Sequence, residues 1–127
     1  MRVKIAVIIS LVLCMASCGR MYEYKDLDGM WQMRSMEKDG VKEQVVDIYY
    51  SFQKHTINLR QVNSYSYFGG YVYVGDSILV KMPADTPKEG LNVLGVDTNE
   101  PHFCVEKVTS NTLILKTDYA RLEFRKY

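Results

Sequence analysis

The chain has 127 residues, which is room for a single domain. Its hydrophobic share of 47% and charged share of 24% are those of an ordinary globular protein and exclude a disordered chain. Sixteen basic residues stand against 15 acidic ones, so no basic surplus points to nucleic acid as a partner. Ten Tyr and many Val and Ile favour strands, and no stretch beyond the leader sustains a helical period, so we expect an all-β domain.

The first segment has the layout of a secretory leader. Arg2 and Lys4 precede an apolar run from Ile5 to Met15, after which small residues lead into Cys18. A charged region, an apolar region and a cleavage zone in this order predict a signal peptide over residues 1–17. The apolar run is too short to span a bilayer as a helix, which needs about 20 residues.

The end of this leader, Met15-Ala16-Ser17-Cys18, resembles the lipobox of bacterial lipoproteins. The resemblance implies that Cys18 is acylated and becomes the first residue of the mature chain, with residues 18–26 as a tether and 27–127 as the domain. The alternative is an ordinary leader with a chance Cys. By the sorting rule of such lipoproteins, Gly19 rather than Asp after Cys18 implies the outer membrane. The tether has no block of acidic residues of the kind linked to surface export, so we expect it to face the periplasm, with the cell surface as the alternative. The mature domain would then have no intramolecular disulfide, because Cys14 is removed with the leader and Cys18 carries the lipid, which leaves Cys104 as the remaining cysteine.

Turn signals divide the rest of the chain into short apolar or aromatic runs, which is typical of hairpins. A continuous sheet of such runs would close on itself, because an open sheet leaves bare edges. We therefore predict a small antiparallel up-and-down β-barrel of about eight strands. The runs are Met30 to Lys38, Val45 to Gln53, Thr56 to Val62, Ser66 to Val74, Ser77 to Met82, His102 to Thr109, Thr112 to Lys116 and Tyr119 to Lys126.

Two places interrupt this pattern. Pro83 to Gly90 is a loop, since two Pro and a closing Gly break any strand, and Leu91 to Val96 is either a short strand or a coil on the barrel. Loops of this length often guard a ligand entrance, so we expect the open end of the barrel there. Gly69-Gly70, inside a Tyr-rich run, predicts a bend where the sheet coils.

The motif Leu27-x-Gly29-x-Trp31, followed by hairpins and a terminal run from Leu122 to Tyr127, resembles the lipocalin-like domains of Gram-negative lipoproteins, which are calycin-type β-barrels. The resemblance implies that Trp31 lies across the closed end of the barrel. It also implies that a basic residue of the last strand, Arg125 or Lys126, packs over the Trp31 ring. Gly29, Trp31, Arg125 and Lys126 are the predicted barrel-closing residues.

Side chains with reactive groups give weaker signals. His102-x-Cys104-x-Glu106 places three possible zinc ligands on one strand face, but at spacings too wide for one ion without further ligands. No Gly-x-Ser-x-Gly elbow is present, and no His lies against Cys104 as a base. We expect no metal, no cofactor and no enzymatic activity.

The predicted function is binding. Aromatic residues of the strands suit an apolar pocket, and Tyr50, Phe52, Tyr71 and Tyr73 are the candidate ligand contacts. The first hypothesis is a lipid-anchored envelope protein that holds a small apolar molecule in its barrel. The alternative is an interaction or inhibitor module that docks on another envelope protein and has no small ligand. A cavity open to solvent would favour the first, and a filled interior with an exposed patch the second.

Overall fold

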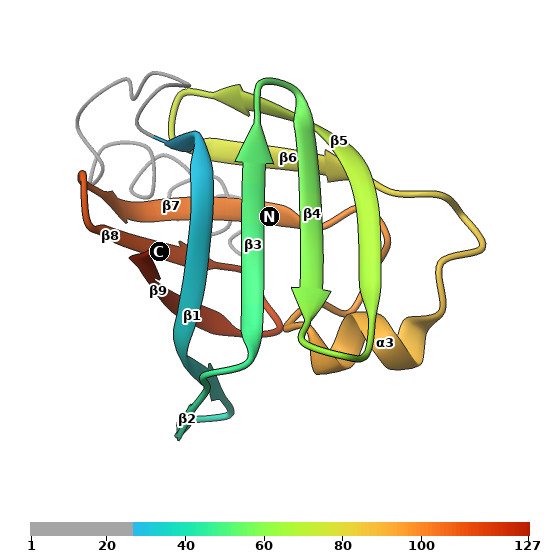
Figure 1. Cartoon of the computed structure of the whole chain (residues 1–127), viewed down its shortest axis with the longest axis horizontal. Helices are drawn as coiled ribbons and strands as arrows, with labels where there is room; N and C mark the ends of the chain where they lie inside the picture. Colours follow the sequence, from blue (N-terminus) through green and yellow to red (C-terminus); the bar gives the residue numbers. More distant parts are fainter. Residues whose placement is uncertain (1–26) are drawn as a thin grey trace, which may run out of the picture.

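The structure, a computed structural model, describes residues 27–127. The predicted signal peptide, the tether and Cys18 lie outside the described residues. The described part contains nine strands and the short helix α3 (Figure 1). The strands are β1 (Gly29–Lys38), β2 (Val41–Gln44), β3 (Ile48–Gln53), β4 (Thr56–Gln61), β5 (Ser66–Val74), β6 (Ser77–Lys81), β7 (His102–Val108), β8 (Thr112–Lys116) and β9 (Arg121–Lys126); α3 is Lys88–Val93.

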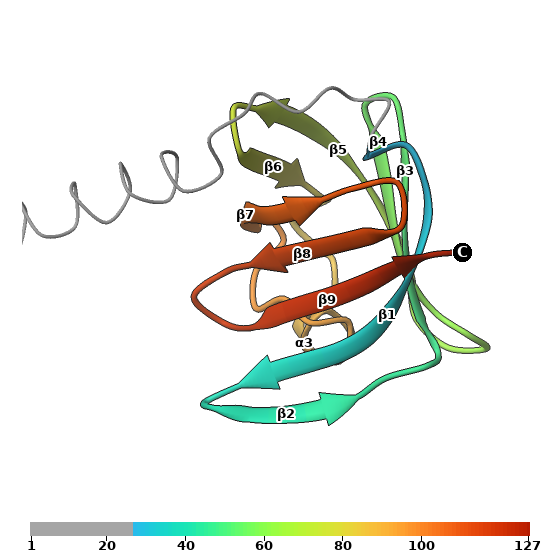
Figure 2. The same ribbon diagram turned by 90° about the vertical axis from the view of Figure 1, so that its left-hand side faces the viewer.

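The sheet closes into a barrel because β1 pairs with β3 on one side and with β9 on the other. The pairings from β3 to β9 are all antiparallel and join consecutive strands, so the barrel is of the up-and-down type. Figure 2 shows β7, β8, β9 and β1 side by side in this order. The predicted fold, an antiparallel barrel of about eight strands, is therefore confirmed.

Alternation along the strands builds the core. In β3 the side chains of Ile48, Tyr50 and Phe52 are buried, whereas Tyr49 and Ser51 between them are only half-buried. In β9 Leu122 and Phe124 are buried in the same way. Successive side chains of a strand point to opposite faces of the sheet, so each strand gives one row to the barrel interior. The interior is the hydrophobic core of the described domain.

The connection between β6 and β7 differs from the prediction. The expected loop ends at Pro87, and α3 begins at Lys88, inside the stretch read as a loop. The ambiguous run from Leu91 to Val96 is neither a strand nor a coil throughout, because its first three residues belong to α3. Among the described residues, no helix is long and apolar enough to cross a membrane.

The hairpin of β1 with β2 is a second difference. Val41–Gln44 pairs with the second half of β1 as an extra strand outside the barrel, and all its residues are exposed. The expected strand from Val45 begins only at Ile48, and Val46 lies exposed in the β2–β3 connection. The strand expected from Tyr119 begins at Arg121.

The glycine pair marks the bend that was predicted. β5 pairs with β4 up to Gly70 and with β6 from Gly70 onward, without a register shift at this point. A Cβ on Gly69 would lie 2.6 Å from Met82 Cγ and 2.7 Å from the Lys81 carbonyl oxygen. Gly69 therefore lets β5 curve closely over β6, as its bent ribbon in Figure 1 shows.

Candidate functional site

One end of the barrel is closed by Trp31. Its side chain is fully buried, and the indole Nε1 donates a hydrogen bond to the carbonyl oxygen of Leu27 at 2.8 Å. This bond satisfies the only polar atom of the ring, which would otherwise be costly to bury. Trp31 thus plugs the end of the barrel at which β1 begins and β9 ends.

Lys126 is the basic residue that covers this plug. It is the register partner of Trp31, and its Nζ lies 4.4 Å from the centre of a Trp31 ring. The same Nζ donates to the carbonyl oxygen of Asp28. Gly29 has φ +124°, and a Cβ there would lie 2.6 Å from Lys126 Nζ, so glycine makes the approach possible. Arg125 pairs with Gln32 on the other face and is exposed.

The four candidate ligand rings lie inside the barrel and are buried. Tyr50 contacts Phe124, with ring centres 4.7 Å apart, and Phe52 contacts Tyr71 at 5.3 Å. Tyr73 is buried beside them in the core. These rings pack as core residues, so ligand contact at Tyr50, Phe52, Tyr71 and Tyr73 stays a prediction.

The opposite end of the barrel is closed by α3 and the residues after it. Leu91 and Leu94 are buried, and the Tyr50 hydroxyl donates to the Leu94 carbonyl oxygen at 2.6 Å. Burial raises the pKa of Tyr50 well above its ordinary value, so this phenol remains a donor. The expectation of an open end beside the Pro83 to Gly90 loop is therefore wrong. The loop is at the expected end, but the apolar side of α3 fills it.

Two glycines allow α3 and the turn after it to pack closely against the barrel. A Cβ on Gly90 would lie 2.0 Å from the Tyr67 hydroxyl oxygen and 2.7 Å from Tyr65 Cδ1, so the helix lies directly against the end of the β4–β5 hairpin. Gly95 has φ +100°, and a Cβ there would lie 3.0 Å from Leu122. The helix position thus depends on two sites where a larger residue has no room.

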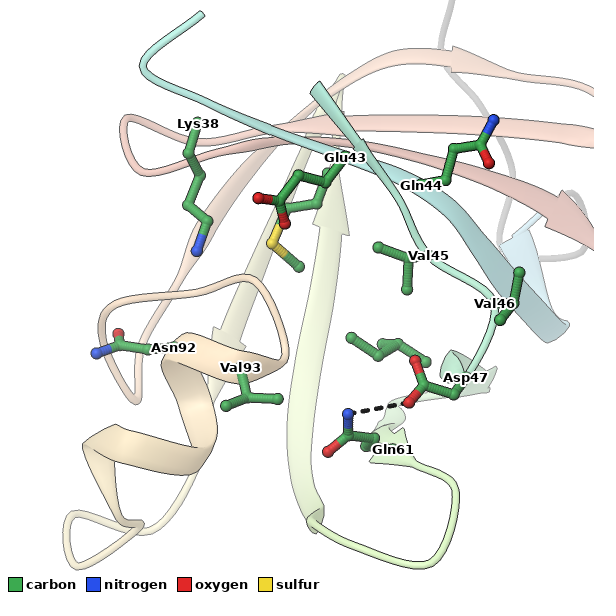
Figure 3. Close-up of a pocket in the computed structure, with 11 residues that line it drawn as sticks. Lys38, Glu43, Gln44, Val45, Val46, Asp47, Gln61, Asn92 and Val93 are labelled. Carbon is green, nitrogen blue, oxygen red and sulfur yellow. Dashed lines mark hydrogen bonds between the residues drawn. The ribbon is translucent and has the colours of Figure 1, made fainter. Parts of the chain in front are cut away.

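A groove of about 470 Å³ opens beside α3, at the end opposite Trp31 (Figure 3). In Figure 3 the side chains of Lys38 and Glu43 come from the β1–β2 hairpin, and those of Asn92 and Val93 come from α3. Apolar and polar side chains both contribute to its lining. The residues are Met36, Lys38, Glu43, Gln44, Val45, Val46, Asp47, Ile48, Gln61, Asn92 and Val93.

The polar groups of the groove differ in how far they are satisfied. Gln61 donates to the Asp47 carboxylate at 3.1 Å, and Lys38 donates to the Tyr119 hydroxyl at 3.2 Å. Asn92 Oδ1 is buried and accepts no hydrogen bond from the described residues. The groove therefore combines apolar side chains with polar groups that are mostly paired within the protein.

The cluster on β7 does not form a metal site. His102 and Glu106 are exposed, and Glu106 accepts a hydrogen bond from Arg121 Nε at 3.3 Å. Among residues 27–127 no three His, Cys, Asp or Glu side chains are close enough together to hold a metal ion. Cys104 is half-buried on β7, and the expectation that the mature domain has no intramolecular disulfide stays a prediction.

The sequence did not predict the groove. Its walls come from the β2–β3 connection and from α3, which are far apart in the chain and meet only in the folded barrel. The spacing of Leu91 and Leu94 by three residues was the available signal, because such a pair shares one face of a helix.

Comparisons with known proteins agree with this architecture. The model of the lipocalin-like domain family matches residues 13–127. A lipocalin-like protein from Bacteroides uniformis shares 27% identity, with a TM-score of 0.70 over 80% of this chain and 99% of that one. An uncharacterised protein from Bacteroides eggerthii shares 28% identity, with a TM-score of 0.65 over 79% of this chain and 98% of that one. No curated protein matches the chain. The chain belongs to the lipocalin-like domain family.

Proposed function

We propose that this protein is a lipid-anchored binding protein of the cell envelope that holds a small, largely apolar molecule at the α3 end of its barrel. The groove beside α3 carries the proposal. Its volume of about 470 Å³ is in the range of small-molecule sites, which is roughly 300 to 1,000 Å³. An eight-stranded barrel is either filled by side chains or has room for one small ligand. Here aromatic residues pack in the interior, so the groove is the accessible place.

The composition of the groove indicates the chemistry of the ligand. Met36, Ile48 and Val93 offer apolar surface, and Lys38, Glu43 and Asp47 place charged groups around it. A molecule with a largely apolar body and a polar end fits this lining. The interior rings, Tyr50 among them, would contact only a ligand that displaces α3.

The envelope location is supported by the sequence of the leader. A signal peptide over 1–17 and a lipobox-like end at Cys18 would anchor the domain to a membrane, with the outer membrane facing the periplasm as the favoured site. Lipid would then supply the apolar attachment while the barrel stays in water.

Native mass spectrometry of the protein purified from its own host tests the binding proposal. We expect the wild-type protein to carry an added small molecule and Val93→Asp to lose it, because a charge in the groove opposes an apolar ligand. Val72→Asp is the matched control, since Val72 is similarly exposed but lies on the outer face of β5. A wild-type protein without any added mass, or equal retention in both variants, would contradict the proposal.

The same spectra test the anchor. Acylation adds the mass of fatty acyl chains to a chain that begins at Cys18, and Cys18→Ser abolishes this mass. A mature protein of unmodified mass would refute the anchor and leave the binding result to be judged separately.

A further inference from the structure

The outer face of the β5–β6 hairpin carries exposed apolar side chains. Phe68 is 63% exposed, Val72 48%, Val74 58% and Leu79 42%. Val72 and Leu79 are direct cross-strand partners, and Val74 follows Val72 on the same face. We call these four residues the apolar arc. Single exposed apolar residues are normal on a protein surface, but a group on one hairpin marks a surface that contacts something apolar.

The charges around the apolar arc have one sign. On the outward faces of β4, β5 and β6 the charged residues are Arg60 and Lys81, and none is acidic. Acidic groups appear beyond these strands, on β7 and β9, where Glu106 and Glu123 are paired with Arg121. The arc is therefore bordered by basic groups that match an anionic surface.

The position of the arc relates it to the N-terminal tether. β1 begins at Gly29, which pairs with the end of β3, and β4 leaves the same end of the barrel. β5 runs past the start of β4, so the tip of the β5–β6 hairpin projects at this Trp31 end, as the upper part of Figure 2 shows. Eight residues, 19–26, separate Cys18 from Leu27 and reach at most about 28 Å. An acylated Cys18 would thus keep the arc within tether length of the bilayer.

We propose that the apolar arc is a membrane-docking surface, on which the lipid-anchored barrel lies against the bilayer with the β5–β6 hairpin at the interface. The inference rests on the proposed acylation of Cys18. Apolar side chains enter the boundary between headgroups and acyl chains, and basic residues such as Arg60 and Lys81 face anionic lipid, which is how peripheral proteins add a second contact to a lipid anchor. This orientation turns the groove beside α3 away from the bilayer, where it is open to soluble ligand.

Quenching by brominated lipid tests the contact. The lipidated protein is reconstituted in vesicles of phosphatidylethanolamine and phosphatidylglycerol with brominated acyl chains. Val74→Trp is compared with Val41→Trp, since Val41 is 62% exposed but lies in β2 at the other end of the barrel. Trp31 is buried in both variants and gives a common background. We expect the added Trp at 74 to be quenched at least twofold more than that at 41.

Three results would overturn the inference in distinguishable ways. If the wild-type protein does not float with the vesicles, the anchor fails and docking fails with it. If the protein floats but both added Trp residues are quenched equally, or neither is, docking alone fails. If the Trp at 74 is shielded from aqueous iodide but not quenched by brominated lipid, a protein covers the arc instead of the membrane.

A measurement on the unsubstituted protein removes the influence of the added Trp. Hydrogen exchange is compared between the lipidated protein on vesicles and Cys18→Ser protein in solution. We expect slower exchange for residues 72–79 on vesicles and equal exchange for residues 39–46. Equal exchange at 72–79 would also contradict docking.

Discussion

The two ends of the barrel are closed by different means. At the first end Trp31 is fully buried, its one polar atom is bonded to Leu27, and Lys126 covers its ring. At the other end α3 is a helix of six residues with no side-chain hydrogen bond at its N-cap, and its Leu91 and the following Leu94 are buried. The first closure is part of the strands themselves, whereas the second is an added segment between two strands.

The two closures differ in how firmly their residues are held in place. A buried group with all its hydrogen bonds made is held in one position, as Trp31 is. A helix of less than two turns is not stable alone, so α3 keeps its place only through packing. The groove lies beside this second closure. The Trp31 end therefore supports the fold, and the α3 end is where the proposed ligand would bind.

Among the substitutions proposed for the two ends, Trp31→Ala should lower the free energy of unfolding most. Truncating a buried Trp leaves a cavity and costs about 3 to 5 kcal/mol in the free energy of unfolding. Urea denaturation, followed by circular dichroism, measures this loss. A loss within about 0.5 kcal/mol is the size expected for a surface position and would contradict the closed end.

At the α3 end, Gly90→Ala should destabilise the protein by less than Trp31→Ala does. The new Cβ would meet Tyr67 and Tyr65, and overpacking of this kind costs about 1 to 3 kcal/mol. Because α3 forms one wall of the groove, ligand retention in native mass spectrometry should fall as well. Gly70→Ala is the control, since its nearest neighbour would lie at 3.6 Å. Unchanged ligand retention in a destabilised Gly90→Ala protein would mean that α3 does not shape the binding site.

Much of the Trp31 end could be predicted from the sequence. The alternation of Ile48, Tyr50 and Phe52 fixes which face of β3 is buried, and antiparallel closure brings the first and last strands together. The choice between Arg125 and Lys126 could not be made from the sequence, because the twist of β9 decides which side chain reaches the indole. Alternation can be read from one strand alone, and closure follows from a general property of antiparallel barrels, so both could be predicted from the sequence.

The α3 end could not be predicted in the same way. Beyond the spacing of Leu91 and Leu94, α3 is too short to show a sustained helical period, and it overlaps a stretch with two Pro. β2 is exposed on both faces, so its sequence Val41-Lys42-Glu43-Gln44 shows no alternation of buried and exposed residues. The groove between them depends on tertiary packing, which no single stretch of the sequence reveals.

Lys126→Met tests how much the cation over Trp31 stabilises this end of the barrel. It keeps the length of the side chain but removes the cation over the indole, a contact that contributes about 0.5 to 2 kcal/mol. Arg125→Met should stay within about 0.5 kcal/mol, because Arg125 is exposed on the other face. Urea denaturation of the two variants side by side gives the comparison. Equal losses would show that the position of Lys126 over the ring contributes nothing specific.

The smallest effect is expected at Glu123, which ties β2 to the barrel beside the groove. Its carboxylate accepts from Arg121 at 2.6 Å and from Lys42 of β2 at 3.3 Å. Burial acts to raise the pKa of Glu123, but these hydrogen bonds and charges outweigh it, and the pKa lies below its ordinary value of 4.5. The stabilisation is therefore present above pH 4.5 and is lost as the pH falls further.

Partly exposed pairs of this kind contribute roughly 0.2 to 1 kcal/mol. We expect Glu123→Gln to be less stable than the wild-type protein by this amount at pH 7 and the difference to become smaller at pH 3, as measured by urea denaturation. Glu43→Gln is the control, because Glu43 is an exposed carboxylate of the same hairpin with no ion pair among those formed by the described residues. A difference for Glu123→Gln that does not change between pH 7 and pH 3 would mean that only the backbone pairing of β2 with β1 holds this wall of the groove.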